Sequence, residues 1–87
     1  MNLEDVAKVL GVEIRLRYPD IDGNWMCNFD DADEKSGCML ISITGRGRLP
    51  MDAMIDYWRQ IQGKVLCFHA TSKEFRREIF ISPNPPK

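Results

Sequence analysis

Gly45-Arg46-Gly47-Arg48-Leu49-Pro50 separates an apolar run rich in β-branched residues from a run with helical periodicity. The two glycines let the backbone turn or approach a ligand closely, and the two arginines carry charge and planar donors suited to phosphate. The following helix points its free N–H groups at the same place, so the stretch predicts an anion-binding turn. The alternative is an ordinary strand-to-helix turn that binds only water, since Pro50 removes one backbone donor.

The segments around this stretch have the periodicities of regular secondary structure. Residues 50–62 place apolar side chains at helical spacing, and Gly63 is suited to end that helix. Upstream, residues 12–18 and 25–29 alternate between apolar and polar side chains, and residues 38–44 are rich in apolar and β-branched residues. These three runs predict an antiparallel three-stranded meander, with the polar residues 30–37 as a hairpin connection.

The remaining elements complete an α+β domain. Residues 3–10 predict a short helix, and residues 64–69 and 77–81 predict two further strands. The predicted order is α-β-β-β-α-β-β, with a mostly antiparallel sheet and the helices on one face. A chain of 87 residues suits one small domain, residues 1–82, followed by a proline-rich C-terminal tail, residues 83–87.

Charge and composition limit the classes of partner that we expect this chain to bind. The formal net charge of −1 provides no basic field, which argues against nucleic acid as a partner. No apolar run is long enough to span a bilayer, and we expect no membrane association. The three cysteines contain no Cys-x-x-Cys pair, so we expect reduced, largely buried thiols in a cytoplasmic protein, without metal or cofactor.

A second group of basic residues follows the strand at 64–69. Lys73, Arg76 and Arg77 flank the aromatic Phe75, and His69 ends the strand. If the last strand neighboured the strand ending at Thr44, this group and Arg46 with Arg48 could reach one ligand. The alternative for this group is a solvated turn.

The candidates for catalysis and metal binding are weak. His69 is the only histidine and has no activated nucleophile beside it, because Cys67 shares its strand face without touching it. We therefore expect that the chain is not an enzyme. The acidic run at residues 30–34 lacks the spacing of a calcium loop and predicts a solvated hairpin tip.

The last two predicted strands carry apolar residues on both faces. Val65 and Cys67 alternate with Leu66 and Phe68, and the strand at 77–81 follows the same pattern. Because helices cover only one face of such a sheet, the other face needs a partner. The pattern predicts a homo-oligomer, in which a ligand site could lie between protomers.

The order of several short motifs resembles that of a family of short, uncharacterised phage and prophage proteins. The pattern consists of the glycine turn at 45–47, Ala53-Met54-Ile55-Asp56-Tyr57, Gly63-Lys64 and Arg76-Arg77-Glu78-Ile79. It covers roughly half of the chain, and Leu49 departs from it because the family usually has threonine there. Tyr18-Pro19-Asp20 is similar to a segment of HicB-type antitoxins, a second and weaker likeness.

These likenesses imply a function by analogy. Some small phage proteins resemble this chain in being compact, oligomeric and non-enzymatic, and they sequester nucleotide immune signals of the cyclic ADP-ribose or cyclic-dinucleotide type. The analogy implies an anti-defence protein in the cytoplasm of an infected bacterial host. The expected ligand-binding residues are Gly45, Arg46, Gly47, Arg48, His69, Lys73, Phe75, Arg76 and Arg77. The alternative is a protein-interaction module, either a HicB-like antitoxin or an inhibitor that docks through its acidic loop.

Overall fold

A computed structural model describes residues 3–83 of the chain. The predicted tail lies outside these residues except for Pro83. The described part is an α+β domain in which every strand pair is antiparallel, as expected. In chain order the elements are α1 (Leu3–Leu10), β1 (Ile14–Arg17), β2 (Trp25–Phe29), β3 (Ala32–Ser36), β4 (Met39–Ile41), β5 (Gly45–Gly47), α2 (Pro50–Ile61), β6 (Val65–Phe68) and β7 (Arg77–Phe80).

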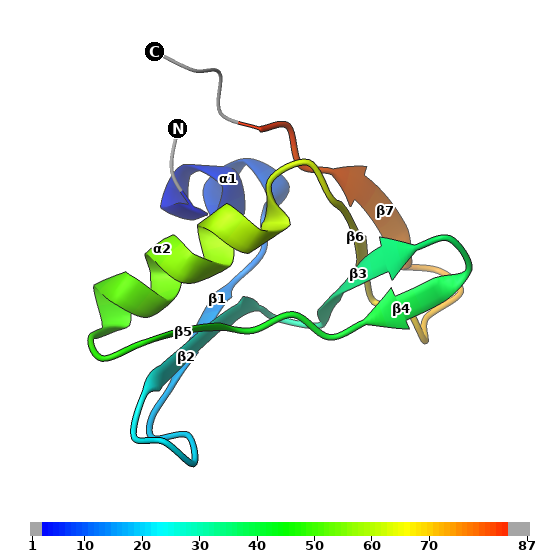
Figure 1. The fold of residues 1–87 in the computed structure, drawn as a ribbon. Coiled ribbons are helices and arrows are strands. Elements are labelled where there is room, and N and C mark those ends of the chain that lie inside the picture. Colours follow the sequence, from blue (N-terminus) through cyan, green and yellow to red (C-terminus); the bar gives the residue numbers. More distant parts are fainter. Residues whose placement is uncertain (1–2, 84–87) are drawn as a thin grey trace.

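The strands form two sheets rather than one. The first sheet has the order β1-β2-β5 and the second has the order β4-β3-β6-β7. Figure 1 shows both helices on one side of β1, β2 and β5, whereas the β3–β4 hairpin extends away from them. The chain passes between the sheets at Asp30 and Asp31, where Asp31 adopts a positive φ of 53°.

One aromatic cluster joins the two sheets. Phe29 of β2 contacts Tyr57 of α2 edge-on, with ring centroids 5.4 Å apart, and its ring centroid lies 6.0 Å from that of Phe68 in β6. All three side chains are buried, together with Ala53 and Ile61, which continue the buried face of α2. The apolar periodicity of residues 50–62 therefore predicts the helix, but two of its apolar side chains, Met51 and Ile55, lie outside the core and are exposed.

Two strands form where the sequence predicted connections. Residues 32–36 form β3, an interior strand of the second sheet. Its charged side chains find partners within that sheet, as where Lys35 Nζ lies 2.8 Å from Glu78 Oε1 on β7, two strands away. Residues 45–47 form β5, which pairs with β2. The prediction of a polar hairpin connection at 30–37 and of a turn at 45–47 was wrong.

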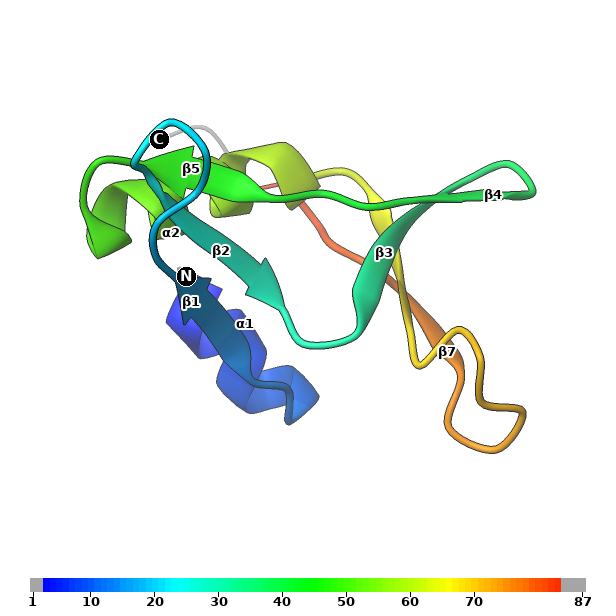
Figure 2. The ribbon, with the colours of Figure 1, turned by 90° about the horizontal axis from the view of Figure 1, so that it is seen from below.

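The predicted meander is also wrong in its third strand. Within residues 38–44 only Met39–Ile41 forms a strand, and this strand, β4, pairs with β3 instead of β2. Ile43 turns back to the core, where it is buried. The chain thus leaves the first sheet, forms a hairpin in the second and returns to the first at β5, a route that Figure 2 shows from below.

The described cysteines are free, as expected. Cys27 and Cys67 are buried, and Cys38 is exposed in the turn between β3 and β4. Burial raises the pKa of the Cys27 thiol from its ordinary value of 9.0 to about 11. This thiol is therefore neutral at physiological pH and is a packing residue.

Candidate functional site

The glycines of β5 admit helix α2 rather than a ligand. A Cβ atom at Gly45 would lie 2.4 Å from both the carbonyl oxygen of Ala53 and the amide nitrogen of Tyr57. A Cβ atom at Gly47 would lie 2.5 Å from the Cβ of Asp52. Because these neighbours belong to the helix backbone or its immediate surroundings, the space that the glycines leave is already filled. The two glycines thus set the close packing of β5 on α2.

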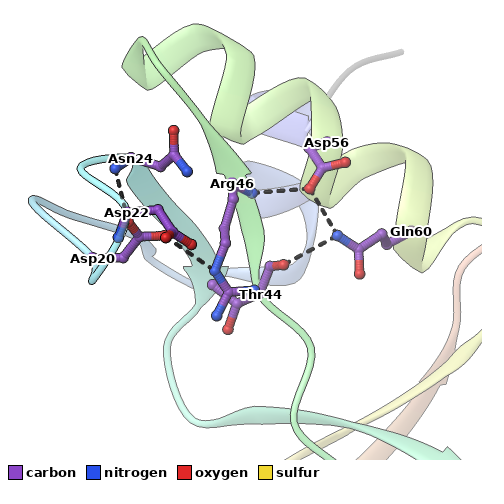
Figure 3. A network of polar contacts seen from close by, with 7 residues as sticks. All are labelled: Asp20, Asp22, Asn24, Thr44, Arg46, Asp56 and Gln60. Carbon is purple, nitrogen blue, oxygen red and sulfur yellow. Dashed lines mark hydrogen bonds and ion pairs between the residues drawn. The ribbon is translucent and has the colours of Figure 1, made fainter.

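Arg46 is held by carboxylates on two sides (Figure 3). Its backbone N–H donates to Asp56 Oδ2 at 2.9 Å, and its Nε lies 3.3 Å from Asp20 Oδ2. Asp56 also accepts hydrogen bonds from Gln60 at 2.9 Å and Arg59 at 2.6 Å. Burial by itself would raise the pKa of Asp56, but these three donors outweigh it and hold the pKa below 3.8. Asp56 is thus an ionised anchor that fixes β5 to α2.

Asp20 is held in the same charged state by its own loop. Its Oδ1 accepts hydrogen bonds from the backbone N–H groups of Asp22 and Asn24, both at 2.8 Å. The bond from Asn24 is the largest cause that lowers the pKa of Asp20, and the charge of Arg46 adds to it. The side chain of Asp20 is only 6% exposed, so Arg46 already has a nearly buried anion as its partner.

The N-terminus of α2 provides little for a second anion. Leu49 occupies the N-cap position without a side-chain hydrogen bond, Pro50 follows it, and Asp52 places a carboxylate in the first turn. Asp52 supplies the negative charge that the helix dipole favours there. Arg48 is exposed and has no ion-pair or hydrogen-bond partner within residues 3–83. Of the four predicted residues in this stretch, Arg48 alone is open to a ligand.

The loop between β6 and β7 forms an open hollow of about 380 Å³. Four of the predicted ligand-binding residues line it together with Glu74: His69, Phe75, Arg76 and Arg77. The side chain of Phe75 is 67% exposed, which is high for an aromatic residue. Lys73 belongs to the same loop but does not line the hollow. The hollow thus combines an exposed aromatic ring with cationic and ionisable groups.

An unusual backbone pair fixes His69 at the edge of this hollow. His69 and Asp31 are the only described residues other than glycine with positive φ, at 54° and 53°. The His69 N–H donates to the carbonyl of Asp31 at 3.1 Å, and His69 Nδ1 lies 3.0 Å from Asp31 Oδ2. These contacts orient the imidazole and leave its Nε2 without a partner among residues 3–83. Since such backbone conformations cluster at functional sites, the pair marks this end of the sheet as a candidate site.

The two arginines of the hollow differ in how firmly they are held. Arg77 Nη2 donates to the carbonyl of Leu10 at 2.7 Å, at the end of α1, and its guanidinium carbon lies 5.6 Å from the centroid of the Phe68 ring. Arg76 makes a longer contact, 3.4 Å, with Glu78. A hydrogen bond from Lys35 is the main cause that lowers the pKa of Glu78, and Arg76 adds to it. Arg77 therefore holds the fold together, and Arg76 is the arginine that a ligand could recruit.

The two predicted basic groups lie at opposite ends of the molecule. Strand β7 neighbours only β6, at the edge of the second sheet, whereas β5 belongs to the first sheet. Figures 1 and 2 both show β5 and the β6–β7 loop at opposite ends of the domain. A common pocket for both groups required the last strand to lie beside the strand ending at Thr44. This condition is not met within one chain.

Two residues of this region are absent from the predicted site: Glu74, which lines the hollow, and Asp31, which contacts His69 at its edge. Asp31 meets His69 because Ala32 pairs with Phe68 in the next position of the ladder. Their separation by 38 positions hides this contact in the sequence. Only a correct prediction of β3 and its register with β6 could have found it.

Comparison with models of known families, with curated proteins and with solved structures finds no match to this chain. Neither helix within residues 3–83 is long and apolar enough to cross a membrane. Within the same residues, no three His, Cys, Asp or Glu side chains gather as a metal ion would need. The chemistry of the hollow is thus the basis for inferring a function.

Proposed function

We propose that this chain is a non-catalytic binding protein that sequesters a small phosphorylated nucleotide at the hollow of the β6–β7 loop. The observation that carries the proposal is the gathering of His69, Phe75 and Arg76 around one open hollow. A nucleotide needs both a surface for its base and donors for its phosphate. The hollow offers both within one short loop.

Each side chain has a role that follows from its contacts. Phe75 presents an exposed ring on which a base can stack. Arg76 can exchange its long contact with Glu78 for a charge-assisted hydrogen bond to phosphate. His69 is oriented by the contact of its Nδ1 with Asp31, so its Nε2 faces a ligand as an acceptor in the neutral ring and as a donor to phosphate in the imidazolium. Glu74 and Glu78 place negative charge nearby, which favours a ligand with one or two phosphates over a long polyanion.

The resemblance to phage proteins supplies the biological context of the proposal. A sponge for cyclic ADP-ribose or a cyclic dinucleotide would act as an anti-defence protein by lowering the concentration of the signal. Such a protein needs affinity and no turnover. Among the residues that line the hollow, none is Ser, Thr, Cys or Lys, which supports binding without cleavage.

The experiment is calorimetry against a panel that includes cyclic ADP-ribose and cyclic di-AMP, with the recovered ligand analysed for cleavage. Loss of a charge-assisted hydrogen bond costs roughly 1.5–3 kcal/mol, so Arg76→Ala should weaken binding by about ten- to a hundredfold. Arg48→Ala is the matched control, because it removes an exposed arginine at the other end of the molecule. If only Arg48→Ala weakened nucleotide binding, the site would lie at residues 45–48 instead. If the recovered ligand were cleaved, the protein would be an enzyme.

A protein-interaction module is the second candidate, and the exposed apolar surface favours it. Side chains such as Ile21, Met51 and Ile55 are 99%, 70% and 57% exposed. The acidic run supports this candidate less than expected, because several of its residues already have partners within the chain. Asp30 contacts Arg15 at 3.4 Å, and Glu34 contacts Lys64 at 3.6 Å. If no nucleotide in the panel binds, docking through apolar side chains becomes the leading function.

A further inference from the structure

Strand β4 is an apolar edge strand without charge. It lies at one edge of the second sheet, and its residues Met39, Leu40 and Ile41 are 64%, 40% and 43% exposed. Residues 36–45 contain no charged side chain, although 29% of the chain is charged. Proteins usually guard such an edge with charge, proline or a bulge, because its backbone groups can pair with another strand. The opposite edge, β7, carries Arg77 and Glu78 and is guarded in this way.

The hairpin geometry identifies which backbone groups of β4 are open. Ser36 pairs with Met39 across the two-residue turn Gly37-Cys38, and Lys35 pairs with Leu40. The residues that close a two-residue hairpin turn are hydrogen-bonded to each other, and hydrogen-bonded and non-bonded pairs alternate along the ladder. The N–H and C=O of Leu40 therefore point away from β3. The N–H is then the donor, and the C=O the acceptor, that a further strand would use.

We propose that β4 pairs antiparallel with β4 of a second copy of this chain, with Leu40 opposite Leu40 of the partner subunit. In this register the two Leu40 residues exchange both backbone hydrogen bonds, and Met39 lies opposite the partner's Ile41. The pairing is symmetric, so one surface serves both copies. The second sheets of the two copies become one continuous sheet.

Two observations favour a second copy over a different protein. First, the absence of charge between residues 36 and 45 suits a self-complementary apolar contact, since a charged partner would find no counter-ion there. Second, Met39 and Ile41 share the sheet face of Leu66 and Phe68 but lie outside the part that the helices cover. In the dimer these side chains cover each other. Figure 2 shows that the β3–β4 hairpin projects from the domain, so pairing at β4 would keep the two domains apart.

The test is sedimentation velocity over a concentration series with variants of Leu40. Leu40→Pro removes the outward N–H but no bond to β3, and edge strands tolerate proline at such positions. Leu40→Val is the matched control, because it keeps the N–H and an apolar side chain, and valine is a good strand former. We expect a dimer for the wild type and for Leu40→Val, and a dissociation constant at least tenfold higher for Leu40→Pro.

A second variant keeps the test decisive if Leu40→Pro does not fold. Leu40→Lys retains the backbone donor and places two like charges opposite each other in the dimer, so it should also give monomers. Circular dichroism should show the wild-type spectrum for each folded variant. A wild type that stays monomeric, or dimers that survive both Leu40→Pro and Leu40→Lys, would overturn the proposal. This outcome is independent of whether a nucleotide binds at the β6–β7 loop.

Discussion

The two arginine-bearing segments of this chain, residues 45–48 and the loop from His69 to Arg77, each carry two arginines but differ in structure. The first is closed: its glycines admit α2, and Arg46 is bound to Asp20 and Asp56. The second is open: it surrounds a hollow of about 380 Å³ and presents Phe75 to solvent. The comparison teaches that glycine and arginine indicate a ligand site only when no element of the protein itself occupies the space.

The strongest way to break this comparison is to add a methyl group to β5. In Gly45→Ala the new Cβ would lie 2.4 Å from two backbone atoms of α2, so the helix must move away from the strand. Overpacking against backbone should cost about 3 kcal/mol or more of unfolding free energy. Chemical denaturation measures this loss.

Gly23→Ala is the control for that variant. A Cβ at Gly23 has no atom within 4 Å, and its positive φ of 78° is the only source of strain. We expect a cost of about 1 kcal/mol there. If Gly45→Ala were as stable as Gly23→Ala, the glycines would be free for a ligand after all.

Alkaline pH tests whether the core beneath β5 is dry. Burial raises the pKa of Cys27 from 9.0 to about 11 and that of Tyr57 from 10.0 to about 12. Because both folded pKa values are raised, the stabilisation is complete below pH 9.0 and is lost as the pH rises towards 11 and 12. Denaturation curves should show a loss of roughly 2–3 kcal/mol for each of the two groups across this range.

The variant Cys27→Ala identifies which part of the fall in unfolding free energy with pH comes from the Cys27 thiol. It should flatten the curve between pH 9.0 and 10.0, where the thiol of the unfolded chain ionises before the Tyr57 phenol does. Wild-type stability that does not change over the alkaline range would mean that water reaches Cys27. The claim that residues 45–48 pack on a closed core would then be wrong.

Part of the core around β5 and α2 could be predicted from the sequence, because the periodicity of apolar residues indicates which elements are buried. The spacing in residues 50–62 identified α2 correctly but its buried face only in part, because Ala53, Tyr57 and Ile61 are buried whereas Met51 and Ile55 are exposed. Strand β3 was missed because four of its five residues are polar or charged, and its partners, such as Glu78, lie far along the chain. Strand β5 was missed because glycine at a turn and glycine beneath a helix are identical in sequence.

The candidate site was predicted only in part for a related reason. His69, Phe75, Arg76 and Arg77 are neighbours in sequence, so they meet whatever the topology. Asp31 joins them through the register of β3 and β6, and Arg46 is kept from them by the separation into two sheets. Contacts that depend on strand order cannot be read from composition or spacing.

A smaller effect separates the two arginines of the open segment. Arg77→Ala removes the hydrogen bond to Leu10 and the contact with the Phe68 ring, which should cost about 1–2 kcal/mol of stability. Arg76→Ala removes an exposed pair and should cost about 0.5 kcal/mol or less. Thermal unfolding of both variants measures the difference. Equal losses would mean that Arg76 is structural and not available to a ligand.

The smallest expected effect is a difference in reactivity between the exposed and the buried cysteine thiols. Cys38 is exposed and Cys27 and Cys67 are buried, so a maleimide should label one thiol rapidly in the native protein. The other two should react only after denaturant is added, which mass spectrometry can follow over time. Rapid native labelling of Cys27 would contradict a closed core beneath β5.

The most direct test of the central claim is a nuclear magnetic resonance titration of isotope-labelled protein with cyclic ADP-ribose and cyclic di-AMP. Backbone amide shifts report where a ligand binds without any substitution. We predict that the amides of His69, Phe75 and Arg76 shift on saturation and that those of Arg46 and Arg48 do not. Shifts centred on Arg46 and Arg48, or no shifts with either nucleotide, would contradict the assignment of the nucleotide site to the β6–β7 loop.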